Sequence, residues 1–526
     1  MLTYSFRDMG NDSLYEYLYK CIRRDILEGK IAAGEKLPSK RSFAKNLGIS
    51  VITVENAYDQ LVAEGYIYSV PKSGYYEAEI RKNLLTPENK DGDPSGDRKR
   101  EMGSGSSQNR EDFDRRIRDR ENPGGEVNSA SGQNDGIQID LVRSRTDPKQ
   151  FPFTIWARLL REVLSEKREV LMNNAPGAGI WELRRAIAGY LLQYQNMQVS
   201  EEQIIIGAGT EYLYSLLIQL LGQDKTYALE DPGYTKLAKI YGNQLVKTVF
   251  IPMDEKGVSV QRLRDSGADV MHISPSHHYP TGITTPIGRR YELLSWANEK
   301  EGRYILEDDY DCEFRMAGRP IPSLQSIDQL GRVIYMNTFT KSLTSTIRIS
   351  YMVLPWELLD RFQEKLGFYS CTVSNFEQYT LAQFISGGYF EKHINRMRNY
   401  YREKRDELLK TIQESPLGEK VSILGADAGL HFLMQVDTQL TDGELIKRAG
   451  EAGVRLSCLS GYYHCSETEP LTEQQQPQNK KGILGEQQGI FRPKEQRDHH
   501  VVVNYSGLDI RQMEALPEAL YRAWFS

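Results

Sequence analysis

A long polar segment divides this chain into two parts of very different size. Residues 81–136 consist mostly of Gly, Ser, Asn, Asp and Arg and offer almost no aliphatic side chain for burial. Such a composition cannot offset the entropy cost of ordering the backbone. The sequence therefore predicts a flexible linker over 81–136, a small folded unit over 1–80 and a large one over 137–526. As a random coil, the linker would span on the order of 40 Å, enough for the small unit to reach a neighbouring subunit.

The overall composition excludes several classes of protein. No apolar run approaches the ~20 residues of a membrane span, and the N-terminal residues are polar, so we expect a cytoplasmic protein without membrane contact. The five cysteines show no metal-ligand spacing, and we expect no metal site. A net charge of -6 argues against indiscriminate coating of nucleic acid, so any affinity for DNA requires a local basic patch.

The small unit has the pattern of three helices followed by a hairpin. Apolar side chains at helical spacing predict a helix over 13–28. Ser39 is a suitable cap for a second helix ending at Gly48, and a third runs from Ser50 to about residue 65. The segment 66–76 alternates and turns, which predicts a two-stranded wing. The tight turn between the second and third helices would let the third enter a DNA major groove.

Basic residues are concentrated in the same unit. Between residues 20 and 45, three acidic residues are outnumbered by eight basic ones, namely Lys20, Arg23, Arg24, Lys30, Lys36, Lys40, Arg41 and Lys45. Phosphate contacts require such a patch. The whole segment resembles the winged helix-turn-helix of the GntR superfamily. The resemblance implies an α+β fold and binding to double-stranded DNA at an operator or promoter.

The resemblance also implies which residues contact DNA. Lys40 and Arg41 would approach the phosphate backbone or a guanine edge. The start of the recognition helix would be formed by Ser50, Ile52 and Thr53, and the wing tip by Lys72, Ser73 and Gly74. The family usually carries Arg directly after the serine, where this chain has Val51. One base contact is therefore expected to be absent or replaced by contact with a thymine methyl group.

The large unit alternates strand-length apolar runs with helical segments. Its expected strands are 203–206, 270–274, 303–306, 333–336 and 349–354. This alternation predicts an α/β domain with a mainly parallel sheet. A second polar stretch, rich in Gln, Glu and Lys, occupies 466–499, and we expect it to be a surface insertion.

Five short segments of the large unit carry its chemistry. They are Gly207-Ala208-Gly209-Thr210-Glu211, Glu230-Asp231-Pro232-Gly233-Tyr234, the loop 274–282, the acidic run 305–311 and Asn337-Thr338-Phe339-Thr340-Lys341-Ser342. In this order they resemble the fold-type-I aminotransferases. The cofactor of that family, pyridoxal 5′-phosphate, needs an amine for its aldehyde, a carboxylate for its pyridine nitrogen, an anion cradle and a stacking surface.

The resemblance implies a role for each segment. Lys341 would be the catalytic residue that forms the Schiff base, with the phosphate held by Thr338, Thr340 and Arg348. The turn at Gly209, Thr210 and Glu211 would offer backbone amides at a helix N-terminus to the same phosphate. Tyr234 would place its ring against the cofactor. Asp308 would face the pyridine nitrogen and Tyr310 the phenolic oxygen; Asp309 is the rival of Asp308, and only the family's Asp-x-Tyr spacing separates them.

Two departures weaken the case for efficient transamination. True aminotransferases usually have Asn before the proline of the loop 274–282, where this chain has Tyr279, and His278 stands where related regulators often have Gln. A transaminase also needs an arginine for the substrate carboxylate, usually near the segment 499–505. That segment has none, and Arg455, Arg492 or Arg497 could substitute only if the fold brings it into the pocket.

The two units in this order resemble the MocR/GabR group of regulators. The resemblance implies a homodimer that binds DNA and senses a small amine or amino acid through aldimine exchange at Lys341. The alternative is an active aminotransferase with an autoregulatory DNA-binding domain. A third reading, a DNA-binding protein with a purely structural large domain, fits the Lys341 segment poorly.

Overall fold

The computed structural model describes residues 4, 6, 13–32, 34–70, 73–78, 138–316, 322–464 and 499–526. The expected linker, nearly all of the insertion, and the wing residue Lys72 lie outside these residues. Within them, no helix has the length and apolar character needed to cross a bilayer.

The N-terminal elements form a winged helix-turn-helix, called here the winged unit. Ser39 accepts a hydrogen bond from the amide of Ser42 at the start of the second helix, and Gly48 ends that helix in the left-handed region at φ 68°. Ser50 caps the third helix by accepting from the amide of Thr53. The elements are α1 (Leu14–Leu27), α2 (Lys40–Leu47), α3 (Val51–Ala63), β1 (Ile67–Val70) and β2 (Gly74–Glu77).

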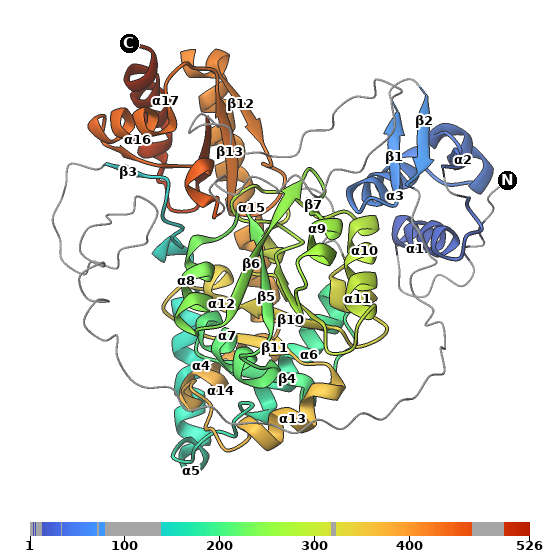
Figure 1. Cartoon of the computed structure of the whole chain (residues 1–526), viewed down its shortest axis with the longest axis vertical. Helices are drawn as coiled ribbons and strands as arrows, with labels where there is room; N and C mark the ends of the chain where they lie inside the picture. Colours follow the sequence, from blue (N-terminus) through green and yellow to red (C-terminus); the bar gives the residue numbers. More distant parts are fainter. Residues whose placement is uncertain are drawn as a thin grey trace, which may run out of the picture.

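The large domain is built on an eight-stranded sheet with helices on both faces (Figure 1). Five neighbouring strands, β10, β9, β8, β5 and β6, run parallel, whereas β11 and β7 are antiparallel to their neighbours. The strand order is β4 (Ile204–Gly207), β11 (Ser350–Val353), β10 (Val333–Thr338), β9 (Tyr304–Asp308), β8 (Val270–Ile273), β5 (Thr226–Asp231), β6 (Lys247–Asp254) and β7 (Gly257–Val258). The predicted α/β class with a mainly parallel sheet is confirmed.

In the middle of the large domain the helices alternate with the strands of the sheet, as the sequence predicts, whereas the first three helices precede the sheet and the last two follow without an intervening strand. They are α4 (Phe153–Glu166), α5 (Arg168–Leu171), α6 (Trp181–Gln195), α7 (Thr210–Leu221), α8 (Thr235–Asn243), α9 (Val260–Asp265), α10 (Ile287–Asn298), α11 (Leu324–Ile327), α12 (Phe339–Ser342), α13 (Trp356–Leu366), α14 (Asn375–Ser386) and α15 (Tyr389–Gln413).

The last part of the chain forms a C-terminal subdomain. An antiparallel sheet of β12 (Val421–Leu424), β13 (His431–Val436), β16 (His500–Asn504) and β15 (Ser457–Cys458) packs with α16 (Asp442–Glu451) and α17 (Ile510–Phe525). The short strand β3 (Ile139–Asp140) enters this subdomain by pairing in parallel with β14 (Val454–Arg455).

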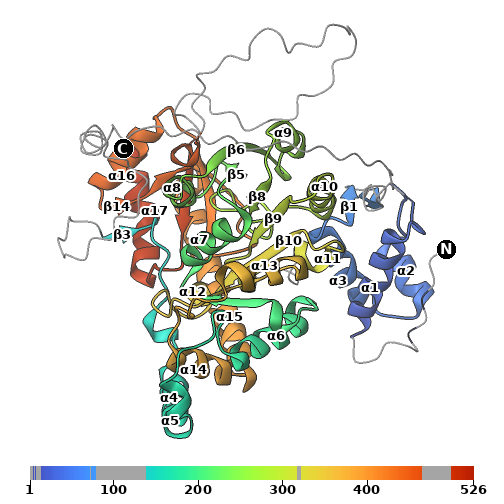
Figure 2. The ribbon, with the colours of Figure 1, turned by 60° about the horizontal axis from the view of Figure 1, so that its bottom comes forward.

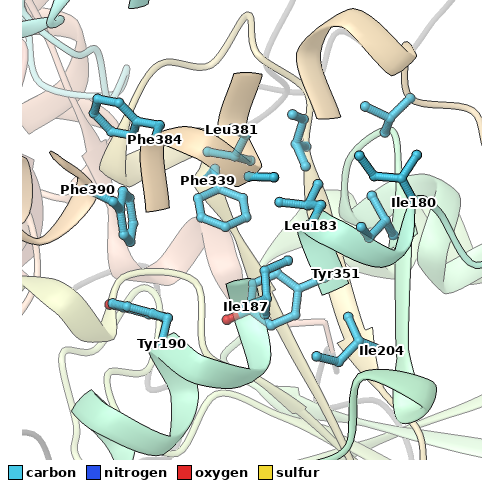
Figure 3. Close-up of a cluster of buried hydrophobic side chains, with 14 of the residues drawn as sticks. Ile180, Leu183, Ile187, Tyr190, Ile204, Phe339, Tyr351, Leu381, Phe384 and Phe390 are labelled. Atoms are coloured by element: carbon cyan, nitrogen blue, oxygen red, sulfur yellow. The ribbon is translucent and has the colours of Figure 1, made fainter. Parts of the chain in front are cut away.

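A core cluster fixes the turn from β10 into α12. Phe339, the first residue of α12, packs 5.7 Å from the ring of Tyr351 and 5.4 Å from that of Phe390. Figure 3 shows these rings together with Leu183 and Ile187 of α6. Since Lys341 follows Phe339 by two residues, this packing holds the lysine-bearing turn against the end of the sheet.

The winged unit packs directly on the large domain at the start of α10. Ile287 is fully buried within the core of the winged unit, and its amide donates to the carbonyl of Glu64, 3.2 Å away. Gly65, at φ 76°, lets the segment after α3 approach the start of α10 so closely that a Cβ at residue 65 would lie 3.0 Å from the Pro286 Cβ. Figures 1 and 2 both show α3 beside α10. The two units are therefore joined by a packed contact in addition to the linker.

Candidate functional site

The lysine segment lies where a parallel strand ends and a short helix begins. Thr338 ends β10, and its hydroxyl accepts from the amide of Thr340, donates to the Thr340 hydroxyl at 2.8 Å and accepts from Ser350 at 2.8 Å. Thr338 is buried and therefore shapes the turn, while Thr340 is the more accessible of the two hydroxyls. Lys341 comes next, at the carboxyl edge of the sheet, where open α/β folds bind ligands.

Asp308 occupies the carboxyl end of the neighbouring strand β9. One of its oxygens, Oδ2, accepts from the hydroxyl of Tyr214, and His272 Nε2 lies 3.6 Å away. The other, Oδ1, is buried and has no hydrogen-bond partner among the described residues. A buried carboxylate oxygen without a donor is costly unless a ligand supplies one. A protonated pyridine nitrogen is such a donor, so the site fits the cofactor that the motifs imply.

Asp309 points to a different environment. Its Oδ2 accepts from the hydroxyl of Tyr335 at 2.9 Å, and burial raises the pKa of the Asp309 carboxyl. Asp309 Oδ1 is likewise buried without a hydrogen-bond partner among the described residues, so the choice of Asp308 as the partner of a pyridine nitrogen still rests on the Asp-x-Tyr spacing. Tyr310 is partly buried, with its hydroxyl 3.3 Å from His277 Nδ1, and desolvation raises the pKa of its phenol.

The glycine-rich turn and Arg348 meet at the N-terminus of α7. Gly209 has φ 94°, and a Cβ there would come within 2.2 Å of the Arg348 Nη2 atom. Only glycine therefore lets the guanidinium lie over this turn. Arg348 itself has φ 50°, a strained conformation for a residue with a side chain. A helix N-terminus combined with a guanidinium is a strong site for a phosphate group.

A second cation beside this turn escapes sequence reasoning. Lys236 of α8 donates to Glu211 Oε1 at 2.5 Å, and Arg348 lies 3.9 Å from Glu211 Oε2. The hydrogen bond from Lys236 lowers the pKa of Glu211. Glu211 therefore stays ionised, and the two cations neutralise its charge beside the turn. In the sequence, the position of Lys236 beside the cofactor region is indicated only by its closeness to Tyr234, two residues earlier.

Aromatic rings line the other side of this region. Tyr234 is 40% exposed and contacts the ring of Tyr279 edge-on at 5.8 Å. Tyr279 packs 4.9 Å from the His431 ring and hydrogen-bonds to the Tyr462 hydroxyl at 3.0 Å. The residue that replaces the usual Asn before the proline thus joins the large domain to the C-terminal subdomain.

Of the three arginines considered as substitutes for a carboxylate-binding arginine, the structure describes Arg455. Arg455 lies on β14, 3.9 Å from the carboxylate of Asp140. Arg492 and Arg497 lie outside the described residues. Strand β16 occupies residues 500–504 and has no arginine in its sequence.

The residues of the winged unit that are predicted to contact DNA differ in how accessible their side chains are. Arg41 and Ile52 are exposed, and Ile52 has 67% of its surface accessible. Lys40 is instead held by Glu55 at 2.9 Å and Asp59 at 3.3 Å. Ser50 and Thr53 bond to each other at the helix start, and Ser73 bonds to the Tyr76 hydroxyl beside Gly74 in the wing. Exposed Arg41 is therefore the better candidate for a direct phosphate contact.

A buried pair, Glu230 and His278, makes part of the site sensitive to pH. Burial raises the pKa of Glu230 from 4.5 to about 8 and lowers the pKa of His278 to about 3. Glu230 Oε2 accepts from the Ser274 amide at 3.0 Å and lies 3.4 Å from His278 Nε2. At neutral pH the neutral carboxyl can donate its proton toward the neutral imidazole.

Replacing Glu230 by Gln is expected to stabilise the protein increasingly as the pH rises. The folded-state pKa of Glu230 lies above its ordinary value, so its favourable contribution is complete below about pH 4.5 and is lost as the pH rises to about 8. Gln keeps an acceptor for Ser274 and a donor for His278. The difference in Tm between Glu230→Gln and the parent should grow from near zero at pH 5 to several degrees at pH 8.5. The exposed control Glu255→Gln should show no such trend; a Glu230→Gln difference independent of pH would contradict this assignment.

Both units of the chain match known protein families. Residues 14–76 match the family of bacterial regulatory proteins called the gntR family, and residues 144–468 match aminotransferase class I and II. An uncharacterized HTH-type transcriptional regulator of Bacillus subtilis, YdeL, is 38% identical over 87% of this chain and 92% of its own length. The probable rhizopine catabolism regulatory protein MocR of Rhizobium meliloti is 32% identical over 85% of this chain and 86% of its own.

Solved structures show the same fold for the large part of the chain. The kynurenine aminotransferase of Pyrococcus horikoshii superposes with a TM-score of 0.60 at 23% identity, covering 74% of this chain and 91% of that one. The aminotransferase domain implies pyridoxal 5′-phosphate as cofactor, in agreement with the unpaired Asp308 oxygen and the cradle at Gly209. The chain belongs to the MocR-type transcriptional regulators, in which a gntR-family DNA-binding unit precedes an aminotransferase class I and II domain.

Proposed function

We propose that this regulator senses a small amine or amino acid at Lys341 and changes its binding to DNA in response. The bound cofactor supplies an aldehyde that captures primary amines reversibly. Lys341 would hold that aldehyde until an effector amine competes for it. Asp308 would bind the pyridine nitrogen, Arg348 and the amides around Gly209 the phosphate, and Tyr310 the phenolic oxygen.

The observation that carries the proposal is a pair of chain segments. Both run from the cofactor pocket, formed around Lys341, Asp308 and Gly209, to the winged unit. The first, residues 274–287, begins with the loop containing Tyr279 and ends at Ile287, in the core of the winged unit. Arg290, fully buried on α10, braces this segment by donating to the carbonyls of Pro275 and Thr285, each 2.9 Å away. Movement of the pocket loop is thereby tied to the helix on which the winged unit rests.

The second segment, residues 308–315, continues from the pyridine-binding strand. It begins at Asp308 and reaches Arg315, which lies close enough to Glu64 to interact with it electrostatically. Burial raises the pKa of the Glu64 carboxyl, and the positive charge of Arg315 partly lowers it again. Glu64 ends α3, the recognition helix, and its carbonyl accepts from Ile287. Both segments thus meet at the same end of the recognition helix, which supports an effect of the pocket on the orientation of the winged unit.

The docked winged unit leaves the opposite end of α3 accessible. Val51 and Ile52 at the helix start are exposed, whereas Glu64 after its end is buried against the large domain. Docking is therefore compatible with DNA binding. In a homodimer, which we propose by resemblance to the family, a change in docking would alter the spacing of two recognition helices relative to DNA half-sites.

The proposal is tested by comparing three readouts in one titration. The cofactor-loaded full-length protein is mixed with a panel of amino acids and amines while cofactor absorbance, keto-acid formation and footprints on its own upstream DNA are recorded. We expect one amine to change both absorbance and footprint, with at most a single turnover. Repeated keto-acid formation without any effect on the footprint would instead support the aminotransferase alternative.

Replacing Ile287 by Ala is expected to weaken the coupling without removing either binding activity. The substitution empties a buried space between the two units, while the pocket residues and the DNA-facing helix start are untouched. The effector-induced change in DNA affinity should fall at least about threefold, whereas the absorbance change persists. Leu263→Ala, which removes a buried side chain of α9 away from the winged unit, should leave the coupling intact. Equal losses in both variants would contradict a role for this contact.

A further inference from the structure

Three buried side chains meet where the large domain joins the C-terminal subdomain. His277 and Asp311 come from the large domain, and His431 begins β13 of the C-terminal subdomain. All three are at most 3% exposed, and one ligand atom of each lies within 4.8 Å of the other two. The two imidazole rings are 4.4 Å apart between centroids. Two imidazoles and a carboxylate form the donor set of many three-residue zinc sites.

The hydrogen bonds of the two histidines leave a nitrogen of each available as a ligand. The Nε2 atoms of both His277 and His431 are buried and lack a hydrogen-bond partner within the described parts of the chain. His277 Nδ1 lies 2.8 Å from Asp311 Oδ2, so an ion bound by both atoms would take the place of the hydrogen bond between them. His431 makes a backbone hydrogen bond to Pro280, and metal-binding histidines commonly donate their second ring N–H to a backbone carbonyl in this way.

Space at the cluster is kept open by a glycine. Gly429 has φ 66°, and a Cβ there would fall 1.9 Å from His277 Cε1 and 2.6 Å from Asp311 Oδ2. A cavity of about 20 Å³ adjoins His277, Asp311 and Gly429. His431 is not among the residues that line it, so this water-sized space lies on the His277 and Asp311 side of the cluster.

We propose that His277, Asp311 and His431 form a binding site for a divalent transition metal ion of the zinc class. The ion would link the loop after β8 and the segment after β9 to strand β13, and so fasten the C-terminal subdomain to the large domain. Cysteine spacing gave no sign of such a site, because its ligands are two histidines and an aspartate from three distant segments. This proposal does not depend on amine sensing.

Zinc binding to the untagged, cofactor-loaded full-length protein tests the proposal. After removal of metals with a chelator and dialysis, titration with zinc chloride should give one ion per chain, with a dissociation constant of about 1 µM or tighter. His431→Asn keeps a donor for Pro280 but removes the free nitrogen, and Asp311→Asn keeps the shape of the carboxylate without its charge. Each should weaken zinc binding by at least about tenfold.

A matched control separates a specific site from loss of structure or binding elsewhere. His393→Gln alters another buried histidine, whose Nε2 lies 2.7 Å from the Ser342 carbonyl, and should bind zinc like the parent. Cofactor absorbance and Tm verify that each variant is folded and loaded. If the parent binds no zinc, or binds it as well as folded His431→Asn does, the cluster is only a hydrogen-bonded joint between the subdomains and the proposal is wrong.

Discussion

Lys341→Ala is expected to yield a protein that carries no covalently attached cofactor and does not respond to amines. The side chain is the amine that we propose as the attachment point, and the surrounding phosphate cradle cannot replace its covalent bond. The absorbance band of the lysine-linked cofactor should be lost, and borohydride reduction followed by mass spectrometry should detect no modified peptide. DNA affinity in the absence of effector should remain within about threefold of the parent, because the winged unit has its own core.

The exposed lysine Lys365, in the last turn of α13, provides a control for this experiment. Lys365→Ala should retain both the cofactor and the response. Loss of DNA binding together with the cofactor in a folded Lys341→Ala protein would contradict the modular organisation. A cofactor that stays covalently attached would show that another lysine is the attachment point.

Arg41→Glu is expected to reduce DNA affinity by at least about tenfold at moderate salt. Arg41 is exposed at the start of α2, whereas its neighbour Lys40 is already paired with Glu55 and Asp59. Reversing the charge removes a phosphate contact and adds repulsion, so the slope of log affinity against log salt should fall by about one or more. Fluorescence anisotropy with duplex DNA from the protein's own upstream region measures both quantities.

A charge reversal on the large domain distinguishes local contact from a change in net charge. Arg264→Glu affects a partly exposed arginine of α9 that pairs with Glu299. It should change DNA affinity by less than about twofold. Equal effects of the two reversals would mean that Arg41 acts only through the overall field of the molecule.

The local elements could be predicted from the sequence because their determinants are local. Ser39, Gly48 and Ser50 cap helices of the winged unit as expected. The five apolar runs of the large unit all became strands of the sheet. Their order could not be predicted, nor that β11 runs antiparallel between β10 and β4, because long-range packing decides strand pairing.

The candidate site was predictable only where its motifs are contiguous. Asp308, Gly209 and Lys341 lie in short segments with recognisable spacing. Their supporting partners come from elsewhere: Tyr214 donates to Asp308 from α7, and Ile287 enters the winged unit from α10. Such contacts arise because the sheet brings distant segments together, so they cannot be predicted from a local sequence pattern.

The central claim is that occupancy of the pocket at Lys341 sets the affinity for DNA. It is tested most directly by titrating an amine that alters cofactor absorbance while measuring the anisotropy of labelled upstream DNA in the same sample. The account predicts a change in DNA affinity of roughly fivefold or more over the same amine concentrations, and none for Lys341→Ala. Complete saturation of the absorbance change with DNA affinity unaltered would contradict it.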